Sequence, residues 1–161
     1  MAGPTKEFWD QRFLAGETPW DRGKPNPQLD AWLADGTLKP CRIAVPGCGS
    51  GYEVAVLAKA GFDVVALDYS PEAIARTRKL LEATSLRAEL VEADALAWRP
   101  SRPFDVVYEQ TCLCALYPDH WRAYADQLHR WLVPEGRLFA LFVQMARPGA
   151  DDCCGSASGE H

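Results

Sequence analysis

The sequence lacks a long apolar run, a paired-cysteine motif and an excess of basic residues. Its longest apolar stretch, residues 138–143, has the length of a strand and falls far short of the roughly 20 residues that span a membrane. Lys and Arg total 17 against 22 Asp and Glu, which gives a formal net charge of −5. Because an acidic surface repels phosphate backbones, we do not expect a nucleic acid as the partner, and because no apolar run is long enough, we do not expect a membrane.

The cysteines and the amino terminus favour a reducing location. Six cysteines are present, and no two stand in a Cys-x-x-Cys pair. The first residues contain no apolar core of a secretory signal. A metal site that joins Cys112 and Cys114 to Cys153 and Cys154 is disfavoured, because the spacing does not fit a zinc knuckle. We therefore expect free thiols, no metal site and a cytoplasmic protein.

The order of apolar segments predicts the fold. The chain has 161 residues, of which 48% are hydrophobic, enough for one buried core. Expected strands cover 41–45, 62–67, 87–91, 104–108 and 137–143. Expected helices cover 5–15, 27–35, 52–60, a segment that begins at 71, and 118–132. This alternation predicts an α/β fold, Rossmann-like and doubly wound, with a mostly parallel sheet of about five strands and helices on both faces.

For two of these helices the sequence predicts which side chains form the buried face. Ser70 is the expected N-cap of the helix that begins at Pro71, and Glu72 pairs with Arg76 four residues later. The buried face of this helix is expected to carry Ile74, Thr77 and Leu81. The expected buried stripe of the helix over 118–132 consists of Trp121, Tyr124, Ala125, Leu128 and Leu132.

A glycine-rich turn follows the first strand. Gly47, Gly49 and Gly51 allow a ligand to approach the backbone closely. A dinucleotide fingerprint needs its third glycine at the position of Tyr52, and Glu53 places negative charge where a pyrophosphate would bind. An oxidoreductase-type dinucleotide domain is therefore the weaker alternative. The turn suits a ligand that carries an amino group and a sulfonium but no phosphate.

Asp68 closes the second expected strand, 21 residues after Gly47. A carboxylate at this position can accept hydrogen bonds from the two hydroxyls of a ribose. The alternative is that Asp68 only begins the turn that caps the next helix. We favour the ribose role because the glycine turn and the acid occur together in the right strand and helix context.

Several motifs together resemble a known family. The segments VPGCGSG at 45–51 and LDYS at 67–70 resemble class I methyltransferase motifs. The segments FW at 8–9, GETPWDRG at 16–23, FDVVYE at 104–109 and CLCAL at 112–116 are more specific. They resemble the thiopurine S-methyltransferase superfamily, most closely its bacterial and plant thiol and halide methyltransferases, over residues 8–145.

The resemblance implies S-adenosylmethionine as the cofactor and a set of site residues. The amino-terminal aromatics would cover the cofactor, and their faces would stabilise its sulfonium. Asp94 would accept a hydrogen bond from the adenine amine, and Ala95 would offer its N–H. Glu109 and Gln110 are the acceptor-side candidates. The implied cofactor-binding residues are Trp9, Phe13, Trp20, Gly47, Gly49, Gly51, Asp68, Tyr69, Asp94, Ala95 and Gln110.

The implied reaction is methyl transfer to a soft, small-molecule nucleophile such as a thiol, sulfide, halide, selenium or tellurium species. Residues 1–40 would form the aromatic lid, 41–146 the cofactor-binding part and 147–161 a disordered tail. The family's sheet continues after the fifth strand, so this chain looks truncated at its carboxyl end. The fifth strand would then be an uncovered edge that favours self-association. A catalytically impaired cofactor-binding remnant is the second alternative.

Overall fold

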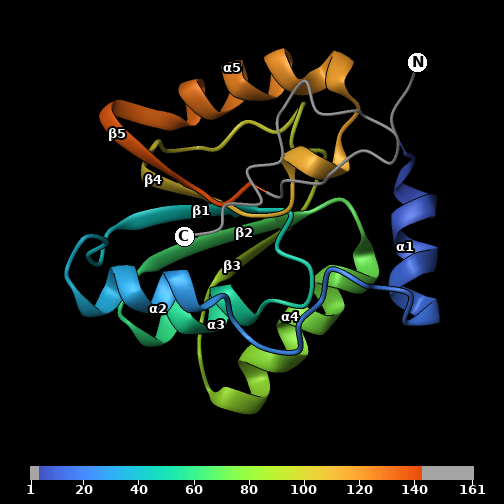
Figure 1. Ribbon diagram of the computed structural model, residues 1–161, viewed down its shortest axis with the longest axis horizontal. Helices are drawn as coiled ribbons and strands as arrows, with labels where there is room; N and C mark the ends of the chain where they lie inside the picture. Colours follow the sequence, from blue (N-terminus) through green and yellow to red (C-terminus); the bar gives the residue numbers. More distant parts are fainter. Residues whose placement is uncertain (1–3, 143–161) are drawn as a thin grey trace, which may run out of the picture.

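The structure, a computed structural model, describes residues 4–142 and contains one five-stranded parallel sheet (Figure 1). The strand order is β3-β2-β1-β4-β5. The strands are β1 (Arg42–Pro46), β2 (Asp63–Asp68), β3 (Glu89–Glu92), β4 (Phe104–Glu109) and β5 (Leu132–Ala140). The helices are α1 (Lys6–Ala15), α2 (Pro27–Ala34), α3 (Tyr52–Lys59), α4 (Pro71–Thr84) and α5 (Trp121–Trp131), with 3-10 turns η1 (Leu113–Ala115) and η2 (Pro118–His120).

The predicted α/β fold with helices on both faces is confirmed. Helix α5 covers one face of the sheet, α2, α3 and α4 cover the other, and α1 lies beyond one end of α4 (Figure 1). Consecutive residues of β1 alternate between the two layers: Ile43 and Val45 pack toward α3, whereas Ala44 packs toward α5. The strands are apolar on both faces because both faces are covered.

Helix α4 begins and packs as predicted. The Ser70 hydroxyl accepts a hydrogen bond from the Ala73 N–H at 3.2 Å, and Arg76 lies 3.5 Å from Glu72. The expected face is buried, at Ile74, Thr77 and Leu81. Side-chain capping and apolar spacing therefore fix this helix locally.

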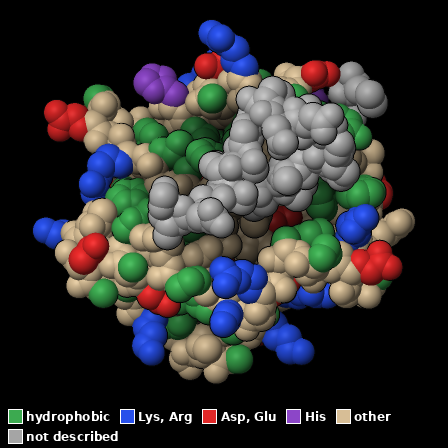
Figure 2. Space-filling model, in the orientation of Figure 1, with side chains coloured by type: hydrophobic (Ala, Val, Ile, Leu, Met, Phe, Trp, Pro, Cys, Tyr) green, Lys and Arg blue, Asp and Glu red, His purple; other side chains and the backbone are tan. Residues whose placement is uncertain are grey.

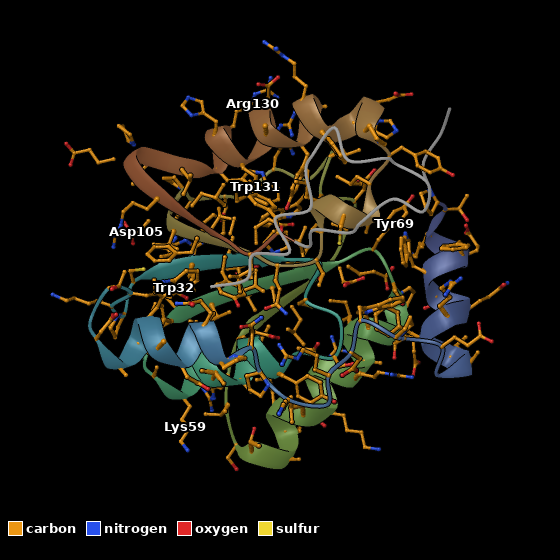
Figure 3. All side chains as sticks on the ribbon, in the orientation of Figure 1. Trp32, Lys59, Tyr69, Asp105, Arg130 and Trp131 are labelled. Carbon is orange, nitrogen blue, oxygen red and sulfur yellow. The ribbon has the colours of Figure 1, made fainter. Side chains whose placement is uncertain are left out.

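The predicted stripe of α5 is wrong in part. Trp121 is 46% exposed, and Ala125 also faces solvent. The buried residues are Tyr124, Gln127, Leu128 and Trp131. Gln127 and Trp131 are buried because they donate hydrogen bonds to backbone carbonyls of Ala95 and Trp98, which a pattern of apolar residues does not reveal. Figure 3 shows Trp131 on the sheet side of α5, with Arg130 on the outer side.

Strand β5 begins earlier than predicted. The segment around Pro134 was expected to separate the last helix from a strand over 137–143, but β5 starts at Leu132. Leu132 pairs with Phe104 and Arg137 pairs with Val106, so a bulge absorbs the intervening residues. A proline is tolerated there because β5 is an edge strand in the part of the chain described.

Some predictions remain untested. The expected tail at 147–161, with Cys153 and Cys154, lies outside the described residues. Self-association through the sheet edge stays a prediction, as does a cytoplasmic location. Across residues 4–142, no helix has the length and apolarity to cross a membrane. Basic and acidic side chains are interspersed on the face shown in Figure 2.

The glycine turn is packed tightly against α4 at Gly51. This residue precedes α3 with a left-handed backbone, φ +85°, and a Cβ placed on it would lie 2.6 Å from the Thr77 Oγ1 atom. Thr77 is fully buried, and its hydroxyl donates to the Gly49 carbonyl at 2.9 Å. Gly51 is therefore required by the packing of α4 as well as by its own backbone.

We expect Gly51→Ala to lower the free energy of unfolding more than Gly61→Ala, measured by chemical denaturation. Gly61 also has a left-handed backbone, φ +95°, but no atom lies within 4 Å of an added Cβ. Gly61→Ala should cost about 1–2 kcal/mol from backbone strain alone. Gly51→Ala should cost roughly 1–3 kcal/mol more, because it also overpacks Thr77. Equal losses would show that the contact with α4 is unimportant.

Candidate active site

The candidate site lies where the sheet changes winding direction. Strands β1 and β4 are neighbours, and the chain leaves them toward opposite edges of the sheet. Parallel α/β sheets bind ligands at the carboxyl ends of strands on either side of this point. The segments that follow β1, β2, β3 and β4 all reach this edge, and they carry most of the predicted site residues.

A cavity of about 510 Å³ lies at this edge. Its volume is in the range of small-molecule sites, and its wall is mainly apolar. Predicted site residues that line it are Trp9, Phe13, Trp20, Gly47, Gly49, Asp68, Tyr69, Asp94 and Ala95. The structure therefore brings together nine of the eleven predicted cofactor residues. Gly51 and Gln110 line a smaller neighbouring cavity instead.

Each of the three positions in the turn requires glycine for a different structural reason. All three have positive φ values: +63° at Gly47, +55° at Gly49 and +85° at Gly51. A Cβ on Gly47 would lie 2.9 Å from the Cys112 Cβ, so Gly47, like Gly51, is needed for contacts within the chain. On Gly49 the nearest atom would be 3.8 Å away, on the Phe13 ring. Gly49 is thus the least crowded of the three glycines, and it lines the large cavity.

Asp68 connects the glycine turn to the start of α4. Its carboxylate is 9% exposed and accepts the Gly49 N–H at 3.0 Å and the Ser70 N–H at 2.9 Å. Burial raises the pKa of Asp68, while these backbone hydrogen bonds oppose the rise. Each oxygen retains a free lone pair that can accept a hydroxyl. The turn-capping role and the predicted ribose role are therefore compatible.

Asp94 and Ala95 form the wall that follows β3. The Asp94 carboxylate accepts the Leu96 N–H at 2.9 Å, and the Asp94 carbonyl accepts the N–H groups of Ala97 and Trp98. Asp94 therefore begins a turn and lines the cavity at the same time. Tyr69, directly after β2, lies on the side of the site nearest α1 (Figure 3) and is 36% exposed.

Three aromatic side chains form one cluster on the wall of the large cavity. Trp20 contacts Trp9 and Phe13 edge to face, with ring centroids 5.7 Å and 5.8 Å apart. Phe13 is buried, whereas Trp9 and Trp20 are partly exposed. The cluster therefore presents aromatic surface to the cavity while Phe13 anchors it to the body of the protein.

Helix α1, which carries Trp9 and Phe13, is fastened to α4 by polar contacts. The Asp10 carboxylate accepts the Ser70 hydroxyl and the Glu72 N–H, both at 2.9 Å. Arg76 donates to the Phe13 carbonyl and lies over the Phe13 ring. Asp10 thus places negative charge at the amino-terminal end of α4, where the helix dipole favours it.

The loop between α1 and α2 docks on the glycine turn and encloses the smaller cavity. Ser50 donates its hydroxyl to the Asp21 carboxylate at 2.6 Å, and the Asn26 N–H donates to Glu53 at 3.2 Å. The cavity, of about 50 Å³, is lined by Arg22 and Lys24 as well as by Glu53. Burial raises the pKa of Glu53. This pocket is polar and carries charges of both signs.

The two acceptor-side candidates occupy different environments. Gln110 lines the small cavity and accepts the Tyr108 hydroxyl at 2.7 Å. Glu109 is 1% exposed and lines neither cavity, contrary to its expected place at the site. Its Oε1 atom accepts the Leu113 N–H at 2.6 Å and the Tyr124 hydroxyl at 3.3 Å. Burial raises the pKa of Glu109, whose role here is to hold the segment after β4.

Sequence reasoning missed the wall that this segment builds. The missed lining residues include Thr111, Cys112, Cys114, Ala115, Leu116 and His120. Their position directly after β4, at the same edge as the glycine turn, was the available signal. Burial raises the pKa of Cys112 and of Cys114, which disfavours reactive thiolates. Among residues 4–142, no cluster of three or more His, Cys, Asp or Glu side chains could hold a metal ion.

The chain is similar in sequence to plant methyltransferases. The chain is 34% identical over 135 residues to probable thiol methyltransferase 2 of Arabidopsis thaliana. The aligned region covers 83% of this chain and 60% of the relative. Thiocyanate methyltransferase 1 of the same plant is 32% identical over 136 residues, with the same coverage. The chain thus spans 60% of the length of these plant relatives.

Two further comparisons concern the fold and the family. A solved structure from work on the conversion of a disulfide bond into a thioacetal group during echinomycin biosynthesis matches with a TM-score of 0.74 and 33% identity. That match covers 84% of this chain and 59% of the solved one. The model of the family described as thiopurine S-methyltransferase (TPMT) matches residues 4–155. Since this match takes in nearly the whole sequence, the chain belongs to the thiopurine S-methyltransferase family of S-adenosylmethionine-dependent methyltransferases.

Proposed function

We propose that this chain binds S-adenosylmethionine in the large cavity and transfers its methyl group to a small, soft nucleophile such as a thiol, sulfide or halide. The observation that carries the proposal is one cavity wall that combines an aromatic cluster with two carboxylates, Asp68 and Asp94. The relatives named for thiol and thiocyanate methylation support the class of acceptor.

The residues present fit this cofactor. Gly49 lines the cavity with no side chain to fill it, and the Asp68 carboxylate lies beside it at the end of β2. Asp68 would hold the ribose hydroxyls, and Asp94 with Ala95 would meet the adenine. The small cavity, with Glu53 and Arg22, suits the zwitterionic amino-acid end, because it offers partners for an ammonium and a carboxylate.

Trp20 has the position expected of a residue that binds a sulfonium. It lines both cavities, as do Gly47, Gly49 and Thr111. Its ring is held edge to face against Trp9 and Phe13, so its orientation is fixed before a ligand binds. An aromatic face stabilises a cation by about 0.5–2 kcal/mol, more where water is excluded.

The chain's own residues need to supply little acid–base chemistry. When bound, S-adenosylmethionine supplies an electrophilic methyl group, and a halide or thiolate is already a competent nucleophile. The apolar side chains of Ala115 and Leu116 line the cavity, where they would limit the access of water to the acceptor. The segment held by Glu109 and the aromatic cluster would align the two reactants, which by itself lowers the barrier substantially.

We expect Asp68→Asn to weaken binding of S-adenosylhomocysteine by about 10–100-fold in calorimetry, because charge-assisted hydrogen bonds to the ribose contribute about 1.5–3 kcal/mol. Asp126→Asn, which removes an exposed acid from α5, is the matched control and should leave the affinity unchanged. A folded wild-type protein that binds no S-adenosylhomocysteine would refute the proposal at its first step.

The same variant gives a pH test. The ionised carboxylate is the form that accepts the ribose hydroxyls, so affinity should be constant above the pKa of Asp68 and fall as pH drops through it. Because burial raises this pKa, the fall should begin at a higher pH than for an ordinary aspartic acid. The Asp68→Asn variant should not show this fall. An identical pH profile in both proteins would contradict the assignment.

We expect Trp20→Leu to weaken binding of S-adenosylmethionine more than binding of S-adenosylhomocysteine, which has no positive charge on sulfur. The difference should be about 2–30-fold, as expected for loss of a cation–π contact. Trp20→Phe keeps an aromatic face and should retain part of the preference. If both ligands lose affinity equally in Trp20→Leu, Trp20 acts only by packing.

Methyl transfer itself is tested by headspace detection of methylated volatile products with iodide, sulfide and a small thiol as acceptors. We expect product from the wild-type chain, and less from Asp68→Asn at subsaturating cofactor. Heat-denatured protein provides the background rate. Cofactor binding without product above that background would leave the binding half of the proposal intact and overturn the transfer half.

A further inference from the structure

A buried glutamine on α5 makes hydrogen bonds that the methyl-transfer proposal does not use. Gln127 is 2% exposed and lies on the face of α5 that meets the sheet. Its side-chain nitrogen donates to the Ala95 carbonyl at 3.0 Å and to the Trp98 carbonyl at 2.9 Å. Its side-chain oxygen accepts a hydrogen bond from Arg99. Both donors of the amide and its acceptor are therefore engaged.

The direction of this amide is determined by its partners. The carbonyl oxygens of Ala95 and Trp98 can only accept, so the Gln127 nitrogen must face them. Trp131, four residues further along α5, also donates to the Trp98 carbonyl at 3.3 Å, as does Arg99. Helix α5 thus holds the turn over residues 95–98 with side chains that do not themselves line the cavity.

These hydrogen bonds reach the cavity wall through one peptide unit. The peptide between Ala95 and Leu96 presents its carbonyl to Gln127 and its N–H to the Asp94 carboxylate. A peptide unit is planar, so fixing the carbonyl also fixes the direction of the N–H. Gln127 is therefore linked to the Asp94 carboxylate by two hydrogen bonds, one on each side of a planar peptide unit.

We infer that Gln127 is a positioning residue that sets the orientation of Asp94 and Ala95 toward the adenine. The inference rests on the proposed function, in which Asp94 accepts from the adenine amine. A buried amide is costly unless its donors and its acceptor are all hydrogen-bonded. Gln127 donates both of its N–H groups to carbonyls of the turn that lines the cavity.

The test compares S-adenosylhomocysteine with its analogue S-inosylhomocysteine, in which a carbonyl oxygen replaces the adenine amine and N1 carries a proton, so that the groups facing both Asp94 and Ala95 change from donor to acceptor or the reverse. A well-placed Asp94 favours the amine and repels the oxygen, so wild-type protein should prefer the adenine ligand by about 10–100-fold in calorimetry. In Gln127→Met the side-chain length is kept but the amide is lost. The preference should then fall by at least about threefold, as expected for loss of buried hydrogen bonds.

Two further variants separate positioning from general stability. Gln127→Asn keeps a polar amide but withdraws it from both carbonyls, so it should also reduce the preference and serves as the test if Gln127→Met does not fold. Tyr124→Phe is the matched control, because it removes one buried hydrogen bond of α5 directed at Glu109, under the other wall. It should leave the preference for adenine unchanged, even if it destabilises the protein.

The outcomes distinguish the inference from the proposed function. A reduced preference in folded Gln127 variants, with Tyr124→Phe like wild type, supports the positioning role. Equal weakening of both ligands by the Gln127 variants, an unchanged preference, or no preference in the wild type overturns this inference and leaves cofactor binding in place. Absence of S-adenosylhomocysteine binding by the wild type overturns both.

Discussion

The site depends on one buried carboxylate. Asp68 ends β2 at the edge where the strands terminate, and it accepts backbone N–H groups from the glycine turn and from the start of α4. Removing a carboxylate from water is costly, and only hydrogen bonds directed at it recover that cost. The same bonds hold Gly49 in a left-handed conformation beside the cavity. In our account, the group that shapes the turn is also the group that binds the ribose.

The other walls of the cavity are stabilised by hydrogen bonds from residues that do not line it. Helix α5 stabilises two of these walls. Tyr124 donates a hydrogen bond to Glu109, which in turn accepts the N–H of Leu113 in the segment after β4. Gln127 donates directly to the Ala95 carbonyl in the segment after β3. On the other side, Asp10 fastens α1 to α4 and so fixes the aromatic cluster. Side chains that line the cavity are therefore oriented by contacts with rigid elements, which is the condition for precise alignment of reactants.

Local signals predicted much of this arrangement. The Ser70 cap, the glycine turn and the alternation of apolar segments determine elements whose cause lies within a few neighbouring residues, and the fold followed from them. The failures have non-local causes. The buried face of α5 includes Gln127, which bonds to carbonyls about 30 residues earlier in the chain, and β5 starts early in a pairing with β4 that contains a bulge. Glu109 stood at the right strand end, but only the packing shows that it points into the protein.

The most direct measurement of the central claim is a crystal structure of the chain with S-adenosylhomocysteine. We expect the ribose hydroxyls on Asp68, the adenine against Asp94 and Ala95, and the sulfur beside Trp20. The amino-acid end should then occupy the small cavity near Glu53. A ligand bound outside the large cavity, or bound within it with the ribose away from Asp68, would contradict the account.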